Sequence, residues 1–173
     1  MKTIVVYRSK SGYTRRYAKW IAQAVGADLR DGRRVPIADL MRYDTIVFGA
    51  AMYAGGINGL SLIKRNLWRL KGKKIIIFTL GATPVREEIA DDIKNDNFTQ
   101  KEQRQIQFFM LRGGFNFSRL TLKDKILMRL LKARLKRIKT PTADQRGMLA
   151  AFDRPVDFTS REHIEPIIEA ITE

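Results

Sequence analysis

The stretch Thr3-Ile4-Val5-Val6-Tyr7-Arg8-Ser9-Lys10-Ser11-Gly12-Tyr13-Thr14 decides the fold. Its first part, Thr3–Tyr7, is almost entirely β-branched or aromatic, which is typical of a strand buried on both faces of a parallel sheet. The part that follows is rich in serine and glycine and predicts a turn. Beyond it, apolar side chains recur every three or four residues from Tyr17 to Val25, which predicts an amphipathic helix ended by Gly26. The stretch therefore predicts a strand, a turn and a helix in succession.

The same alternation continues along the chain. Further strands are predicted at residues 27–30, 45–49, 73–80 and 106–111, and helices over 60–70, from Thr83-Pro84 onward, and after the capping-box pattern Thr159–Glu162. Strands alternating with helices indicate right-handed βαβ units. The prediction is a single α/β domain over residues 1–173, a three-layer sandwich with a five-stranded parallel sheet in the order 2-1-3-4-5.

Composition narrows the function classes. The chain has no cysteine and one histidine, which excludes disulfides, thiolate catalysis and cysteine- or histidine-rich metal centres, so no metal ligands are predicted. His163 is expected on the surface of the last helix. No apolar run approaches the ~20 residues that cross a bilayer, and the N-terminus lacks a signal-peptide pattern, so we expect a cytoplasmic protein. The formal net charge of +15 implies an anionic partner.

The turn Ser9–Thr14 has the features of an anion site. A helix N-terminus offers unpaired N–H groups and about half a positive charge, hydroxyls add donors, and Gly12 allows close approach of a ligand. The turn lacks the glycine patterns of triphosphate and dinucleotide sites, so a mononucleotide monophosphate fits it better. By pattern alone, a turn that only caps the helix is an equal alternative.

The segment Tyr7–Thr14 resembles the flavodoxin signature [TS]-x-[TS]-G-x-T, placed after an N-terminal strand as in that family. With the rhythm of strands and helices, the resemblance covers essentially the whole chain. It implies a flavodoxin-like fold and FMN as cofactor. It also implies that the FMN phosphate is surrounded by Ser9, Lys10, Ser11, Gly12, Tyr13 and Thr14.

Two more strand ends are expected to flank the isoalloxazine ring. They contribute Ala50, Ala51, Met52, Tyr53, Ala54 and Gly55, and Thr79, Leu80, Gly81 and Ala82. Tyr53 is expected either to stack on the ring or to pack beneath its own loop with Met52. The second loop lacks the aromatic residue of many electron-transfer flavodoxins, so the flavin is expected to be open on that side, as a substrate requires. No catalytic side chain is predicted, because redox chemistry belongs to the flavin.

A basic insert, residues 118–151, interrupts the alternation before the last helix. Residues 118–139 contain nine basic side chains and one acidic, Asp124, a net charge of +8. Apolar side chains at helical spacing run beside the charges: Leu127, Met128, Leu131, Leu135 and Ile138. Such a helix is typical of a surface that binds an anionic membrane or an acidic redox protein through Lys123–Lys139. The alternative is a helix that docks its stripe on its own domain; nucleic acid is less favoured, since aromatic residues are not interleaved.

The insert resembles that of the menaquinone-dependent, flavodoxin-type protoporphyrinogen oxidases, with Phe109–Gly114 before it and Val156–Thr159 after it in corresponding positions. The resemblance implies a membrane-facing insert that meets a quinone or a porphyrinogen. The leading expectation is an FMN-dependent oxidoreductase that passes electrons to a quinone or another acceptor. The alternatives are a flavodoxin-type electron carrier docking an acidic partner, and a flavin-free domain that binds another anion.

Overall fold

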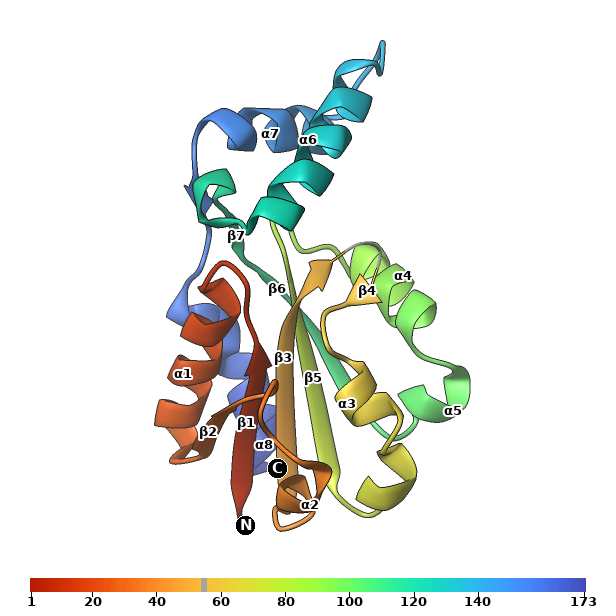
Figure 1. The fold of residues 1–173 in the computed structure, drawn as a ribbon. Coiled ribbons are helices and arrows are strands. Elements are labelled where there is room, and N and C mark those ends of the chain that lie inside the picture. The colour runs from red at the N-terminus through yellow and green to blue at the C-terminus, as the bar shows by residue number, and fades with distance from the viewer. Residues whose placement is uncertain (54–55) are drawn as a thin grey trace.

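The computed structural model describes residues 1–53 and 56–173, and its centre is a parallel β-sheet (Figure 1). The five parallel strands are β1 (Thr3–Arg8), β2 (Asp28–Asp31), β3 (Thr45–Tyr53), β5 (Lys74–Gly81) and β6 (Gln107–Arg112). They lie in the order β2-β1-β3-β5-β6, which confirms the predicted order. The additional β4 (Gly56–Ile57) pairs antiparallel with the end of β3.

Helices cover both faces of the sheet and account for the continuous apolar strands. On one face, Val5, Val47 and Ile76 pack against α1 (Tyr13–Val25) and α8 (Glu165–Thr172). The alternating residues Ile4, Ile46 and Ile77 point to the other face. There they meet α2 (Ile37–Leu40), α3 (Ser61–Lys64) and the 3₁₀ turn η1 (Leu67–Leu70); α4 (Glu87–Asn97) and α5 (Gln100–Gln103) complete that layer. Strand residues that alternate between two apolar layers have no polar face, as predicted.

Three predicted helix boundaries are wrong. The helix expected over residues 60–70 is divided into α3 and η1, and Asn66, between them, turns its side-chain amide back to the carbonyl of Leu62 at 2.9 Å. Thr83 and Pro84 stay in a loop: Arg86, before the helix, is still extended, and α4 begins only at Glu87. Thr159 does not cap the last helix: its hydroxyl oxygen accepts from Arg16 Nη1 at 2.8 Å, and its hydrogen is donated to Asp157 Oδ1 at 2.7 Å.

The insert is built on a short hairpin at the carboxyl end of the sheet (Figure 1). β7 (Gly114–Phe115) pairs antiparallel with β8 (Val156–Asp157). Between them lie the turn η2 (Phe117–Arg119) and two helices, α6 (Leu122–Lys136) and α7 (Ala143–Asp153), which pack together. Residues 116–155 therefore leave and rejoin the domain at one point and stand above the strand ends.

No helix in the described ranges, 1–53 and 56–173, combines the length and apolar character needed to cross a membrane.

Candidate functional site

The turn between β1 and α1 presents unused donors. Gly12 precedes α1 with φ at +98°, and no side chain caps the helix. Ser9 Oγ accepts from the Gly12 N–H at 3.1 Å, and the Arg16 N–H bonds to Gly12 O at 3.0 Å. In the described part of the chain, the N–H groups of Tyr13 and Thr14 have no hydrogen-bond acceptor. The turn thus does not cap the helix with its own hydroxyls, and its free donors fit a phosphate monoester.

The two other predicted loops lie beside this turn, because the parallel strands β1, β3 and β5 end at the same edge. Ala50 is paired with Thr79, and Ala51 with Leu80. Thr79 Oγ1 donates to Ala50 O at 2.9 Å, and both residues are fully buried, so they join the strands beneath the site instead of lining it. Ala54 and Gly55 lie outside the described residues.

A cavity of about 260 Å³, the strand-end cavity, opens above these loops. Of the predicted residues, those that line it are Lys10, Ser11, Tyr13, Thr14, Ala51, Met52, Tyr53, Leu80, Gly81 and Ala82. Ser9 and Gly12 face a separate polar hollow beside β2. The strand-end cavity therefore brings the three loops together, with an anion-binding turn at one side and apolar walls at the other.

The insert supplies much of the remaining wall. The lining residues that sequence reasoning missed are Asn58, Thr83, Gly114, Phe115, Leu120, Asp124, Met128, Leu131 and Met148. Met128 and Leu131, two of the five residues of the predicted apolar stripe of α6, face the domain across this cavity. Asp124 could have been found from the sequence, because it is the one acidic residue among nine basic ones in residues 118–139.

An ion pair between a partly exposed lysine and a buried carboxylate joins the insert to the phosphate turn. Lys10 Nζ donates to Asp124 Oδ1 at 2.7 Å and lies 3.2 Å from the centre of the Tyr53 ring. Thr121 Oγ1 donates to the other oxygen, Oδ2, at 2.8 Å. Asp124 is 3% exposed. Burial raises the pKa of its carboxyl, but hydrogen bonds led by Lys10 outweigh burial and hold that pKa below its usual value.

Two tyrosines of α1 support the hairpin of the insert. The Tyr13 hydroxyl donates to Val156 O at 3.3 Å, and the Tyr17 hydroxyl donates to Arg112 O at 2.8 Å. His163 Nδ1 lies 2.8 Å from the same Tyr17 hydroxyl. His163 lies in the turn η3 (Arg161–Ile164), just before the last helix, and its side chain is partly exposed there. In the described ranges, no group of three or more His, Asp or Glu side chains could hold a metal ion.

Similar solved structures include oxidised Flavodoxin 1 from Bacillus cereus, 19% identical with a TM-score of 0.47, covering 80% of this chain and 100% of that one. A flavoprotein in complex with FMN from Lactobacillus acidophilus is 16% identical with a TM-score of 0.45, covering 64% of this chain and 92% of that one. Two-electron reduced flavodoxin from Megasphaera elsdenii is 22% identical with a TM-score of 0.45, covering 64% and 84%. A search of curated proteins gives no match. The sequence matches the family described as Flavodoxin domain (Flavodoxin_5) over residues 4–142, most of its length, so the chain belongs to the flavodoxin domain family.

Proposed function

We propose that this protein is an FMN-dependent oxidoreductase that takes electrons from a reduced organic substrate and passes them to a quinone or another acceptor. The observation that carries the proposal is the strand-end cavity, which has an anion-binding turn on one side and a roof formed by the insert. Membership of the flavodoxin domain family supports FMN as the cofactor. When bound, FMN supplies the redox chemistry.

The chain's own residues position the cofactor. The free N–H groups of Tyr13 and Thr14, at the positive end of α1, hold the phosphate. Tyr53 and Met52 flank the ring on the β3 side, and Leu80–Ala82 on the β5 side. The pairing of Ala50 with Thr79 and of Ala51 with Leu80 fixes where these two loops begin.

The roof favours an enzyme over a simple electron carrier. Leu120, Met128, Leu131 and Met148 place apolar walls over the site. Such walls exclude water and accommodate an apolar substrate, whereas a carrier needs its flavin edge open to a partner protein. Together with the resemblance of the insert, this roof supports the more specific assignment of a protoporphyrinogen oxidase-like enzyme.

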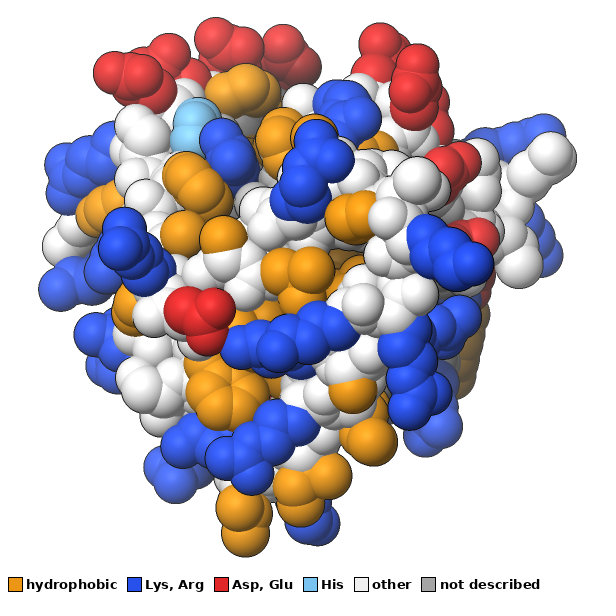
Figure 2. All heavy atoms as spheres, turned by 90° about the horizontal axis from the view of Figure 1, so that it is seen from above, with side chains coloured by type: hydrophobic (Ala, Val, Ile, Leu, Met, Phe, Trp, Pro, Cys, Tyr) orange, Lys and Arg blue, Asp and Glu red, His pale blue; other side chains and the backbone are white. Residues whose placement is uncertain are grey.

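The outer face of α6 supports a role at an anionic membrane surface. Leu122, Ile126 and Leu130 follow one another at four-residue spacing and are 75%, 53% and 65% exposed. Viewed from the end that carries the insert, lysine and arginine side chains spread over the molecule with hydrophobic ones between them (Figure 2). Apolar side chains insert at the headgroup boundary while each nearby Lys or Arg adds ~1 kcal/mol of attraction to anionic lipid.

The same basic face supports a second candidate function, electron transfer to an acidic redox protein. Complementary charge steers the encounter of two such proteins and makes their association rate strongly dependent on salt.

Reconstitution distinguishes these functions. The purified chain is incubated with FMN, gel-filtered, and examined for flavin absorption bands; absence of the bands contradicts both candidates. The loaded protein is then mixed with protoporphyrinogen and a menaquinone analogue while porphyrin fluorescence is followed. We expect acceleration over autoxidation, over the FMN-free chain and over the same mixture without the quinone. A flavin-loaded protein that gives no acceleration instead supports the carrier.

A further inference from the structure

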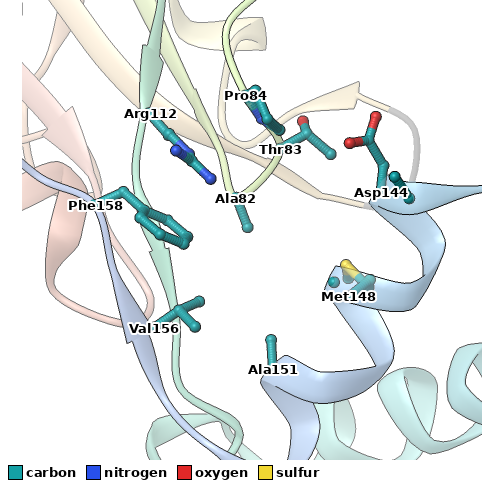
Figure 3. A pocket seen from close by; sticks show the side chains of 11 residues that line it. Ala82, Thr83, Pro84, Arg112, Asp144, Met148, Ala151, Val156 and Phe158 are labelled. Atoms are coloured by element: carbon teal, nitrogen blue, oxygen red, sulfur yellow. The ribbon is translucent and has the colours of Figure 1, made fainter.

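A second cavity, the Arg112 cavity, adjoins the strand-end cavity on the side of α7 (Figure 3). Its volume is about 250 Å³. It lies between the loop Ala82–Pro84, the end of β6, and the segment that carries Val156 and Phe158. The two cavities share three lining residues, Ala82, Thr83 and Met148. A molecule held in the Arg112 cavity can therefore extend toward the flavin site.

The side chains of α7 that face this cavity are small and leave it unfilled. Ala143, Gly147 and Ala151 line it at four-residue spacing, so the helix presents a surface of small residues. Gly147 lies inside the helix, where glycine is less stable than alanine. A Cβ atom at this position would meet no heavy atom within 4 Å, so close packing does not demand the glycine. The absence of a side chain at Gly147 enlarges the Arg112 cavity.

Among the described residues, Arg112 has no anionic partner in this apolar setting. Its guanidinium lies 3.6 Å from the centre of the Phe158 ring and points into the space beside Ala82 (Figure 3). The Nε atom is buried and has no hydrogen-bond partner among the described residues. The one carboxylate that lines the cavity, Asp144, is paired with Arg86. A buried N–H group without an acceptor is destabilising, and an anion bound to this guanidinium would offset that cost.

We propose that the Arg112 cavity binds the carboxylate end of an apolar organic molecule, with the carboxylate on Arg112 and the apolar body along the small-residue face of α7. The planar guanidinium suits a carboxylate because it donates two parallel hydrogen bonds. Phe158 and Val156 provide the opposite apolar wall. This inference rests on the proposed function only in taking the bound molecule to be the enzyme's reduced substrate.

A pair of probes of equal shape tests the site. The full-length protein, incubated with FMN, is titrated by calorimetry with 2-naphthoate and separately with the neutral 2-naphthamide. We expect Arg112→Gln to weaken naphthoate binding about tenfold or more, the effect of losing a charge-assisted hydrogen bond, and to leave naphthamide binding within about twofold. Arg112→Lys should retain part of the naphthoate affinity. Arg161→Gln, which makes the same charge change beside Trp20, should alter neither affinity.

Gly147→Leu locates the binding in this cavity. The leucine side chain enters the open space and should weaken both probes together, while alleviating the helix cost of glycine and so preserving the thermal unfolding midpoint. Three results would overturn the inference. Naphthoate fails to bind the parent protein, or it binds the Arg112→Gln variant as tightly as the parent, or its affinity is unchanged in the Gly147→Leu variant.

The two proposals fail separately. Naphthoate binding that depends on Arg112 in a chain that shows no flavin bands would uphold the Arg112 cavity and remove the FMN function. If the flavin-loaded enzyme is active but naphthoate binds the Arg112→Gln variant as tightly as the parent, only the assignment of the Arg112 cavity is overturned.

Discussion

Gly12 controls the phosphate turn through its backbone. Its φ of +98° is unfavourable for any residue with a Cβ, although a Cβ there would meet no other atom. Replacement by alanine thus strains the turn without a steric clash.

We predict that Gly12→Ala weakens FMN binding about fivefold, since strain of ~1 kcal/mol falls on the conformation that presents the N–H groups. Quenching of FMN fluorescence on titration measures the affinity. Gly26→Ala is a matched control, because Gly26 ends the same helix at φ +63° with equally open space. Equal loss of FMN affinity in both variants would show that the turn has no special part in binding.

Asp124 joins the phosphate turn to the insert, and the stability that it provides depends on pH. Because its folded-state pKa is lowered, the carboxylate stabilises the fold above its unfolded pKa, near 3.8. That contribution is lost as the pH falls through the lower folded pKa.

We predict that Asp124→Asn destabilises the protein by ~1–2 kcal/mol at pH 7, as expected for a hydrogen-bonded pair whose lysine is partly exposed. The difference from the parent should shrink below pH 4, measured by denaturant unfolding. Asp153→Asn is the control, since Asp153 pairs with Lys132 on the same insert but its side chain is 74% exposed. A difference that persists unchanged at low pH would argue against the ion pair as its cause.

Helix α6 presents two apolar faces, not the single stripe that its sequence predicts. Met128 and Leu131 face the strand-end cavity and Leu135 is buried, whereas Leu122, Ile126 and Leu130 are exposed. Leu127, placed in the predicted stripe, is also exposed. Spacing alone reveals that a helix has an apolar side, but not which part of a broad side meets the core.

We predict that changing Leu122, Ile126 and Leu130 together to serine abolishes sedimentation with vesicles of mixed phosphatidylglycerol and phosphatidylcholine. The exposed side chains lose the apolar contribution to binding, yet the fold keeps its stability because they are not part of the core. Trp68→Ser removes a residue that is 77% exposed elsewhere and should leave sedimentation intact. Parent protein that sediments equally with pure phosphatidylcholine would contradict an anionic-surface role.

The sequence predicts an element well where its residues can be buried in only one kind of structure. The strands follow from runs such as Ile75–Phe78, which only a sheet covered on both faces can bury. The capping box predicted at Thr159 is absent because Arg16 donates to the same hydroxyl oxygen, and Pro84 lies in a loop instead of at a helix start. Short patterns identify a possible hydrogen bond but not the competing partner.

The sequence predicts the three strand-end loops of the candidate site, but not the residues of the insert that cover them. The three loops follow from strand order, since parallel strands end at one edge. The roof depends on contacts such as Lys10 with Asp124, 114 residues apart in the chain. A separation of this size leaves no local pattern, and only the folded molecule reveals the pair.

On the scale of the whole molecule, the insert is a roof on a complete sheet. We predict that replacing residues 116–155 by a Gly-Asn turn between β7 and β8 leaves a folded protein that still binds FMN. Iodide should quench the bound flavin's fluorescence more strongly than in the parent, because the residues of the roof that line the cavity are gone. Unchanged quenching would mean that the insert does not shield the flavin.

The pairing of Gly114 with Asp157 has an evolutionary consequence. The insert begins and ends on neighbouring residues, so its length is almost independent of the sheet below. Doubling a flexible excursion of this kind costs only ~0.6 kcal/mol of closure entropy. Selection can therefore lengthen, shorten or exchange the roof while the phosphate turn stays as it is. The substrate can therefore change during evolution while the cofactor site is kept.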